Sequence, residues 1–201
     1  MGSTTGDNGL FYRKWWEIGQ EQTLRTCDSE STSLSSPQKW YPCNRGGEFR
    51  RWYGNLVDVA DWQFNGKHIR EFAKSYPRNL SQNFRQSITW NLITSGRLSA
   101  RLSPTGCVFD QAGPFAIPTD PHKEMIILAS INSSVSQAAM DLMNPTLNCP
   151  PGVMAQIPLF SPDKADVQEK IKQVTLKLVD LSKADWNTQE TSWDFKRSPL
   201  V

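Results

Sequence analysis

Residues 87–110 read SITWNLITSGRLSARLSPTGCVFD, and they form the clearest β-strand pattern in the chain. Two breaks, Thr94-Ser95-Gly96 and Pro104-Thr105-Gly106, separate three apolar-rich runs and are typical of tight turns. The spacing therefore predicts an antiparallel three-stranded β-meander over residues 87–113.

The second run of this meander, residues 97–103, alternates between apolar and polar side chains. A strand period of two puts Leu98, Ala100 and Leu102 on one face and Arg97 and Arg101 on the other. The two arginines would lie about 13 Å apart on an outer face that also carries hydroxyl groups. This pattern predicts a basic sheet face, although an ordinary solvated face would have the same composition.

Outward from the meander, residues 39–53 read KWYPCNRGGEFRRWY, with four basic residues, five aromatic residues and the pair Gly46-Gly47. Basic side chains contact phosphates and base edges, aromatic rings stack on bases, and glycines allow a close backbone approach. The stretch therefore suits nucleic-acid binding. The alternative is that the aromatic residues belong to the core and the arginines solvate an edge.

The charge distribution supports a polyanionic partner. The formal net charge is +2, but residues 39–101 hold eleven Lys or Arg against four Asp or Glu. Residues 116–201 hold eight against ten. A positive middle region is the pattern expected for contact with a phosphate backbone.

The remaining segments predict a mixture of strands, helices and loops. Residues 55–62 alternate like a strand that ends at an Asn65-Gly66 turn, and residues 67–74 have helical spacing. Residues 21–37 are rich in Ser and Thr and predict a loop. Residues 11–18 are compatible with a strand, with a short helix as the alternative. Residues 120–143 predict one helix that stops at Asn144-Pro145.

A C-terminal helix is expected to begin at Ser161-Pro162-Asp163, with Ser161 as its cap. Its apolar stripe should pack on the body along one face; the stripe consists of Val167, Ile171, Val174, Leu178 and Leu181. The polar tail, residues 185–195, holds three aromatic residues, a composition that typically clips a tail to a body or to a neighbouring domain.

Several classes of function lack sequence support. The four cysteines include no C-x-x-C pair, so we expect neither a zinc site nor a disulfide framework. His68 and His122 are the only histidines and lie in no metal-binding or triad motif, and phosphate-cradling glycine motifs are absent. No apolar run is long enough to span a bilayer, and no signal peptide is visible, so a cytoplasmic location without membrane contact is the expectation.

Nine segments together resemble a known family, the adenine-specific DNA methyltransferases of bacteriophage-exclusion (BREX) defence systems, in the region C-terminal to the catalytic domain. The segments, which occur in the family's order, are residues 5–8 with 15–17, 39–42, 46–55, 88–90, 109–110, 131–133, 142–148, 182–186 and 191–195. The part around Asn132-Ser133 and Ile157-Pro158 is also similar to specificity domains of related type II restriction-modification enzymes.

The resemblance implies a DNA target-recognition role here and adenine-N6 methylation, with S-adenosylmethionine and a flipped adenine, only in a larger parent enzyme. The family's F-x-G-x-G methyl-donor loop and N-P-P-Y motif have no counterpart, and Asn144-Pro145-Thr146-Leu147 is not one. We therefore expect no catalysis and no cofactor in this chain alone, which looks like a piece of its parent.

The fold class implied is α+β, an antiparallel β-meander with packed helices in a TaqI-like specificity or target-recognition domain. The expected divisions are residues 1–20 as a linker from the catalytic domain, 21–160 as the target-recognition domain, and 161–201 as a helix and tail that begin a truncated helical region. The expected partners are double-stranded DNA and the missing catalytic domain.

The candidate DNA contacts come from the basic stretch and the meander. Arginines are candidates for phosphate or guanine, and Asn44 and Asn91 for base edges. The full set is Lys39, Tyr41, Asn44, Arg45, Gly46, Gly47, Arg50, Arg51, Asn91, Arg97 and Arg101.

Two alternatives remain open at this level. The chain could be a protein-interaction module whose C-terminal helix and aromatic tail dock other BREX proteins or a phage inhibitor. It could also be a truncated fragment with an incomplete core and no activity of its own.

Overall fold

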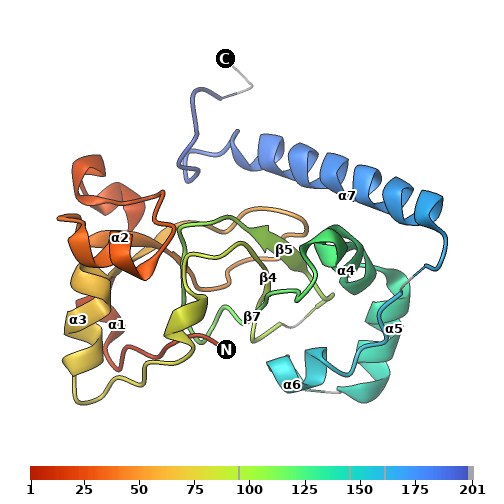
Figure 1. The fold of residues 1–201 in the computed structure, drawn as a ribbon, viewed down its shortest axis with the longest axis horizontal. Coiled ribbons are helices and arrows are strands. Elements are labelled where there is room, and N and C mark those ends of the chain that lie inside the picture. The colour runs from red at the N-terminus through yellow and green to blue at the C-terminus, as the bar shows by residue number, and fades with distance from the viewer. Residues whose placement is uncertain (95, 145, 161, 199–201) are drawn as a thin grey trace.

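The computed structural model describes residues 1–94, 96–144, 146–160 and 162–198. Within these residues the chain forms a mixed α+β fold with two β-sheets and seven α-helices. The helices α1, α2 and α3 gather at one end, α4, α5 and α6 at the other, and α7 runs along one side (Figure 1). The expectation of an α+β fold is thus confirmed, whereas the TaqI-like architecture stays a prediction.

The first sheet combines segments from three parts of the chain. It has the order β1-β3-β2-β6. Its strands are β1 (Tyr12–Lys14), β2 (Trp40–Asn44), β3 (Asp58–Asp61) and β6 (Val108–Phe109). The predicted strand at residues 55–62 is confirmed as β3, which pairs antiparallel with both β1 and β2.

The second sheet contains two strands of the predicted meander. It has the order β5-β4-β7, all antiparallel, and consists of β4 (Ser87–Trp90), β5 (Ala100–Ser103) and β7 (Phe115–Ala116). The β4–β5 hairpin is confirmed, with Ile88 opposite Leu102. Of its expected turn, Ser95 lies outside the described residues.

The third strand of the meander is wrong, because residues 108–109 join the first sheet and pair parallel with β2. At the preceding turn, Gly106 has φ +92° and donates its N–H to the Phe84 carbonyl, while Phe84 N–H bonds the Cys107 carbonyl. These bonds direct the chain away from β5, so Val108 is buried in the core of the first sheet.

The helical segments near the N-terminus differ from the predicted loop. Residues 21–37 contain most of η2 (Gln20–Gln22) and all of α2 (Glu30–Ser35). Helix α2 begins where the Ser29 hydroxyl accepts the Thr32 N–H as an N-cap. The prediction missed this cap because the segment is rich in serine throughout. The other short helices are α1 (Asn8–Phe11), η1 (Trp15–Glu17) and η3 (Leu80–Gln82).

Helix α3 (Gln63–Glu71) combines two predicted features. Asn65 and Gly66 have φ of 57° and 70°, so the expected turn is present as a left-handed first segment. The rest of α3 covers the first part of the helix expected at residues 67–74.

The helix expected at residues 120–143 is divided, which corrects the prediction of one continuous helix. It comprises η4 (Pro121–Lys123), α4 (Glu124–Ile131) and α5 (Ser134–Met143). The Asn132 amide bonds both the N–H and the carbonyl of Ala100 at 2.9 Å, and Ser133 caps α5. The helix ends at Asn132 because that side chain satisfies the edge of β5. Pro145, part of the predicted stop, lies outside the described residues; α6 (Pro151–Met154) follows.

Helix α7 (Ala165–Trp186) begins after Lys164, and Ser161, its expected cap, lies outside the described residues. The predicted buried stripe is wrong in part, because Val174 is 53% exposed and Leu181 is 58% exposed. The buried positions are Thr175, Val179 and Trp186. Helix α7 packs on α4 through a face that is rotated about the helix axis from the predicted stripe by about one residue, which is about 100°.

Each sheet has its own hydrophobic core. The core of the first sheet includes Phe11, Tyr12, Tyr41 and Trp62, and that of the second includes Trp90, Leu128 and Val179. Residues 1–20, expected as a linker, thus supply core residues and an edge strand; the domain divisions themselves stay predictions. No described helix has the length and apolar character required to cross a membrane.

Candidate nucleic-acid interface

The centre of the basic stretch is a loop at residues 45–55, between β2 and β3. Gly46 and Gly47 have φ of +85° and +130°, values that only glycine adopts without strain. A Cβ atom on Gly47 would lie 2.9 Å from the Asn55 side chain, whose amide donates to the Glu48 carbonyl. The glycine pair therefore lets the loop turn tightly against Asn55.

The loop is fixed to the β4–β5 hairpin by two side chains. Arg101 Nη2 donates to Asn91 Oδ1 at 2.8 Å, and Asn91 Nδ2 donates to the Gly47 carbonyl at 2.6 Å. Arg101 Nη1 lies 3.4 Å from the Arg50 carbonyl, and Trp52 forms a bridge beside β5. These bonds connect β5 to the back of the loop.

A groove of about 490 Å³ opens between this loop and the segment that follows β4. We call it the Phe49 groove; its lining is Gly47, Glu48, Phe49, Asn91, Ile93, Thr94, Gly96 and Arg97. Phe49 is 56% exposed, and the Arg51 guanidinium lies over its ring at 5.6 Å. Arg97 is exposed. The groove thus has an exposed ring and one exposed cation, Arg97, in its lining, and the half-buried Arg51 lies over that ring. This combination suits stacking and phosphate contact.

A second pocket, of about 590 Å³, shares Gly47 and Glu48 with the Phe49 groove. We call it the Trp16 pocket, after an indole that is 48% exposed. Its cations already have carboxylate partners: Lys14 lies 2.8 Å from Asp58, and Arg50 pairs with Asp185.

Arg45, which also lines the Trp16 pocket, is held from several sides. It lies 3.5 Å from Asp58 and 3.9 Å from Asp110, and its guanidinium stacks 4.1 Å above the Tyr12 ring. Asp110 in turn accepts the Tyr12 hydroxyl at 2.7 Å. Arg45 therefore contributes to a network that holds β1 and β2 together.

The predicted outer face of β5 is wrong for Arg101, which is fully buried. Arg101 lies opposite Thr89, on the side of the hairpin that the 45–55 loop and the end of β2 cover. Burial, and then the nearby positive charge of Arg50, lower the pKa of Arg101 to about 10. The side chain therefore stays protonated at neutral pH.

Three other candidates lie away from the groove surface. Tyr41 and Asn44 are buried, and Asn44 donates to Thr89 Oγ1 across the two sheets. Lys39 pairs with Asp61 at 3.4 Å. Of the predicted residues, the fold gathers Gly46, Gly47, Arg50, Arg51, Asn91, Arg97 and Arg101 around the groove and its loop.

Sequence reasoning missed the groove residues Ile93 and Thr94 and the pocket residues Lys14 and Trp16. The latter two stand in the segment expected to be a linker, and no local pattern connects them with residues 45–55. Asp185, the partner of Arg50, is 135 positions away along the chain.

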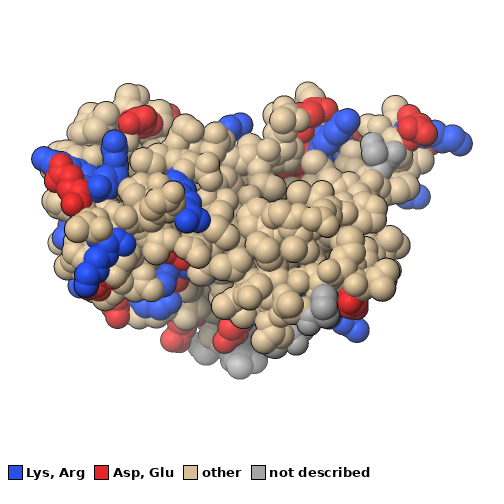
Figure 2. Space-filling view, turned by 90° about the horizontal axis from the view of Figure 1, so that it is seen from below, with Lys and Arg blue, Asp and Glu red and all other residues tan. Residues whose placement is uncertain are grey.

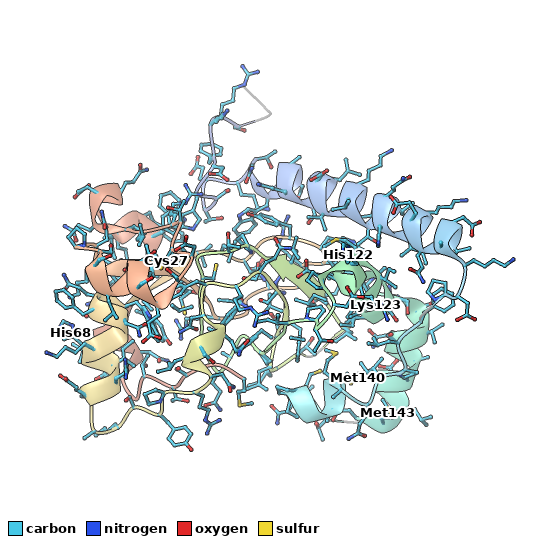
Figure 3. All side chains as sticks on the ribbon, viewed as in Figure 1. Cys27, His68, His122, Lys123, Met140 and Met143 are labelled. Atoms are coloured by element: carbon cyan, nitrogen blue, oxygen red, sulfur yellow. The ribbon has the colours of Figure 1, made fainter. Side chains whose placement is uncertain are left out.

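Charged side chains are unevenly distributed on the face seen in Figure 2. They gather over the end formed by α1, α2 and α3, whereas the half that contains α4, α5 and α6 is mainly uncharged. Figure 3 shows that His68 and His122 lie in different halves of the molecule. Among the described residues, no group of three His, Cys, Asp or Glu side chains could hold a metal ion.

Comparison with known proteins finds two relatives. The chain is 35% identical over 208 aligned residues, its whole length, to adenine-specific methyltransferase PglX of Lacticaseibacillus casei (strain Zhang), of which it covers 17%. It is 30% identical over 200 residues, 98% of its length, to adenine-specific methyltransferase BrxX of Escherichia coli O9:H4 (strain HS), of which it covers 15%. The chain thus spans about one sixth of the length of these curated relatives. No family model matches it.

Proposed function

Because the chain is homologous along its whole length to two adenine-specific methyltransferases, we propose that it is the DNA target-recognition part of an adenine-N6 DNA methyltransferase that serves BREX defence or restriction-modification. The whole-length alignment is the observation that carries this proposal. The parent's catalytic domain would methylate a flipped adenine, while this part would hold the neighbouring duplex.

The Phe49 groove is the proposed contact surface. Arg51 and Arg97 have no carboxylate partner among the described residues, so their charges remain available for phosphates. Phe49 and Ile93 supply apolar surface for sugar or base edges. Arg45 and Arg50 line the Trp16 pocket and Lys39 lies away from the groove, and all three have carboxylate partners, so we assign none of them to DNA contact.

S-adenosylmethionine does not fit the glycine pair of this chain. Glycine loops bind cofactors where the backbone leaves open space for the ligand. Here a Cβ atom on Gly46 would lie 3.0 Å from the Ala112 carbonyl oxygen, and one on Gly47 would meet Asn55. We therefore assign the methyl donor and the catalytic step to the rest of the parent.

A fluorescence-anisotropy titration tests the proposal. It measures the affinity of the chain for a short duplex DNA at salt concentrations from about 50 to 200 mM. The affinity of the wild-type chain should fall steeply as salt rises, since phosphate contacts release counterions. An Arg51→Ala/Arg97→Ala variant should bind more weakly, with a log–log salt slope shallower by about 1 for each lost phosphate contact.

A charge-matched control is Arg70→Ala/Lys177→Ala, which removes exposed cations on α3 and α7. Its affinity and slope should stay close to those of the wild-type chain. A folded wild-type chain that does not bind duplex even at about 50 mM salt would disprove the proposal.

A protein-docking role is the second candidate, and one observation favours it. An apolar groove of about 490 Å³ lies between α4, α5 and α7, lined in part by Val135, Leu159 and Phe160, which are 47–68% exposed. Exposed apolar patches often mark protein interfaces. Binding of a defence-system or phage protein that is insensitive to salt, without DNA affinity, would favour this candidate.

A further inference from the structure

Arg101 is a buried cation without a counter-ion. Its side chain is fully buried in β5, and no carboxylate of the described residues pairs with it. Its Nε has no hydrogen-bond partner. Burying an unpaired charge costs free energy, and a well-packed apolar residue would avoid that cost. Structural stability alone therefore does not account for an arginine here.

The other arginines near the loop have a different environment. Arg45 lies near two carboxylates, and Arg50 pairs with Asp185. Arg101 is instead surrounded by neutral acceptors, Asn91 Oδ1 and the Arg50 carbonyl, with the Arg50 guanidinium as a nearby like charge. The described fold leaves this one buried positive charge without compensation.

The location of the guanidinium connects it with the Phe49 groove. Asn91 lines the groove and accepts from Arg101, and the same Asn91 amide holds the Gly47 carbonyl. A charge one hydrogen bond behind a groove wall, in a low-dielectric surrounding, raises the positive potential in the groove. An anion bound there would be the missing counter-ion.

We propose that Arg101 is a positioning residue of the DNA site: it fixes the Gly47 loop through Asn91, and its charge is compensated by a backbone phosphate bound in the Phe49 groove. This inference rests on the proposed function. The arginines then have two roles. Arg51 and Arg97 contact the phosphates directly, whereas the buried Arg101 acts through Asn91 and through its charge. The ligand chemistry is a phosphodiester with one negative charge.

The test compares Arg101→Met and Arg101→Lys in the full chain by thermal unfolding and duplex-DNA anisotropy at low salt. Arg101→Met removes the buried charge, so its thermal midpoint should stay equal or rise, while its DNA affinity falls about tenfold. Arg101→Lys keeps the charge and should recover the affinity to within about threefold of wild type. A residue with a merely structural role would show the reverse, a lower midpoint with unchanged affinity of the folded protein.

Asn91→Asp gives Arg101 a carboxylate partner, but it replaces the amide group that donates to the Gly47 carbonyl with an oxygen. The loss of that bond is common to both backgrounds, so the change in thermal midpoint caused by Asn91→Asp should be more favourable in the wild-type chain than in Arg101→Met. If Arg101→Met folds poorly, the DNA affinity of Asn91→Asp decides: its carboxylate takes the place of the phosphate, so wild-type affinity in this folded variant contradicts the inference.

Two results would overturn the inference: wild-type affinity in Arg101→Met, or an Arg101→Lys variant as weak as Arg101→Met. If Arg51→Ala/Arg97→Ala loses DNA binding while Arg101→Met does not, the inference fails and the proposed function stands. The last measurement is the thermal midpoint with and without inorganic phosphate at constant ionic strength. If phosphate stabilises the wild-type chain but not Arg101→Met, and no duplex binds, the site belongs to a free anion and the proposed function fails.

Discussion

Asn44 stands at the end of β2, and its side chain reaches across to the second sheet. Its amide donates to Thr89 Oγ1, and the Thr89 hydroxyl donates to the Pro114 carbonyl at 2.9 Å. Both residues are buried, so their polar groups depend on each other. At the scale of the residue, the Asn44 amide, a predicted base-edge contact, connects the two sheets.

Asn44→Ala should therefore act on stability. Removing the donor leaves a buried threonine hydroxyl with one partner fewer, and the free energy of unfolding should fall by about 1 to 3 kcal/mol. Urea unfolding measures this free energy. The matched control is Asn148→Ala at an exposed position, whose free energy of unfolding should stay within about 0.5 kcal/mol of wild type. A full loss of DNA affinity in a stably folded Asn44→Ala variant would instead restore the base-reading role.

The four cysteines are free thiols, and all are buried. Burial raises the pKa of Cys107 and of Cys149 to about 11, from about 8.5 in an unfolded chain. Between these two values the unfolded state has lost the proton that the native state retains. The stability that these thiols contribute is present below about pH 8.5 and is lost as the pH rises toward about 11.

For each such thiol the free energy of unfolding should fall by about 1.4 kcal/mol per pH unit in that window. Cys107→Ala removes one of them, so its loss of stability between pH 8.5 and 10 should be smaller than that of wild type by about 2 kcal/mol. Urea unfolding in the presence of a reductant at both pH values gives the comparison. Parallel pH dependences of the two proteins would show that Cys107 does not titrate in this way.

At the scale of the element, α7 carries two apolar stripes, and only one faces the body. Val179 is 6% exposed and belongs to the core of the second sheet, whereas Val174 on the same helix is 53% exposed. Hydrophobic spacing within a helix shows that an apolar face exists. It does not decide which of two candidate faces meets α4.

This pair of valines gives an internally matched test. Val179→Ala should lower the free energy of unfolding by about 1 to 3 kcal/mol, since it removes buried methyl groups and leaves a cavity. Val174→Ala should change it by no more than about 0.5 kcal/mol. Urea unfolding of both variants measures the two changes in unfolding free energy. Equal losses would mean that Val174 is covered in solution.

At the scale of the whole molecule, the C-terminal tail packs on η1, the short helix that directly follows β1. The Trp193 ring stacks on Trp15 at 5.0 Å, its Nε1 donates to the Leu56 carbonyl at 2.7 Å, and Arg25 lies over it at 5.0 Å. The Trp15 indole in turn donates to the Thr191 carbonyl at 2.8 Å. The aromatic tail is thus clipped to the body, one of the two outcomes expected from its composition.

Trp193→Ala should lower the free energy of unfolding by about 2 to 4 kcal/mol, because it removes the stacking, the hydrogen bond and the cation–π contact together. Trp16→Ala, at a neighbouring ring that is 48% exposed, should cost less than about 1 kcal/mol. Chemical unfolding followed by circular dichroism compares the two. Equal losses of unfolding free energy in the two variants would contradict the packing of the tail on the body.

Recognition of the fold from the sequence succeeded where the signals are local. The β4–β5 hairpin, β3 and the existence of α7 follow from side-chain period and turn residues. Helix α2 escaped prediction because its capping Ser29 lies in a Ser-rich run typical of loops. The division at Asn132 escaped because its cause, the Ala100 backbone, is 32 positions away.

The sequence by itself determined the strands β3, β4 and β5 and the existence of α7, because those elements depend on turns and periods within a few residues. Its ordered motifs also determined the resemblance to adenine-specific DNA methyltransferases. Only the tertiary structure decided which sheet β6 joins, which face of α7 is covered and which arginine is buried. These outcomes depend on partners far along the chain, such as Asp185 for Arg50, and no local pattern encodes such a pairing.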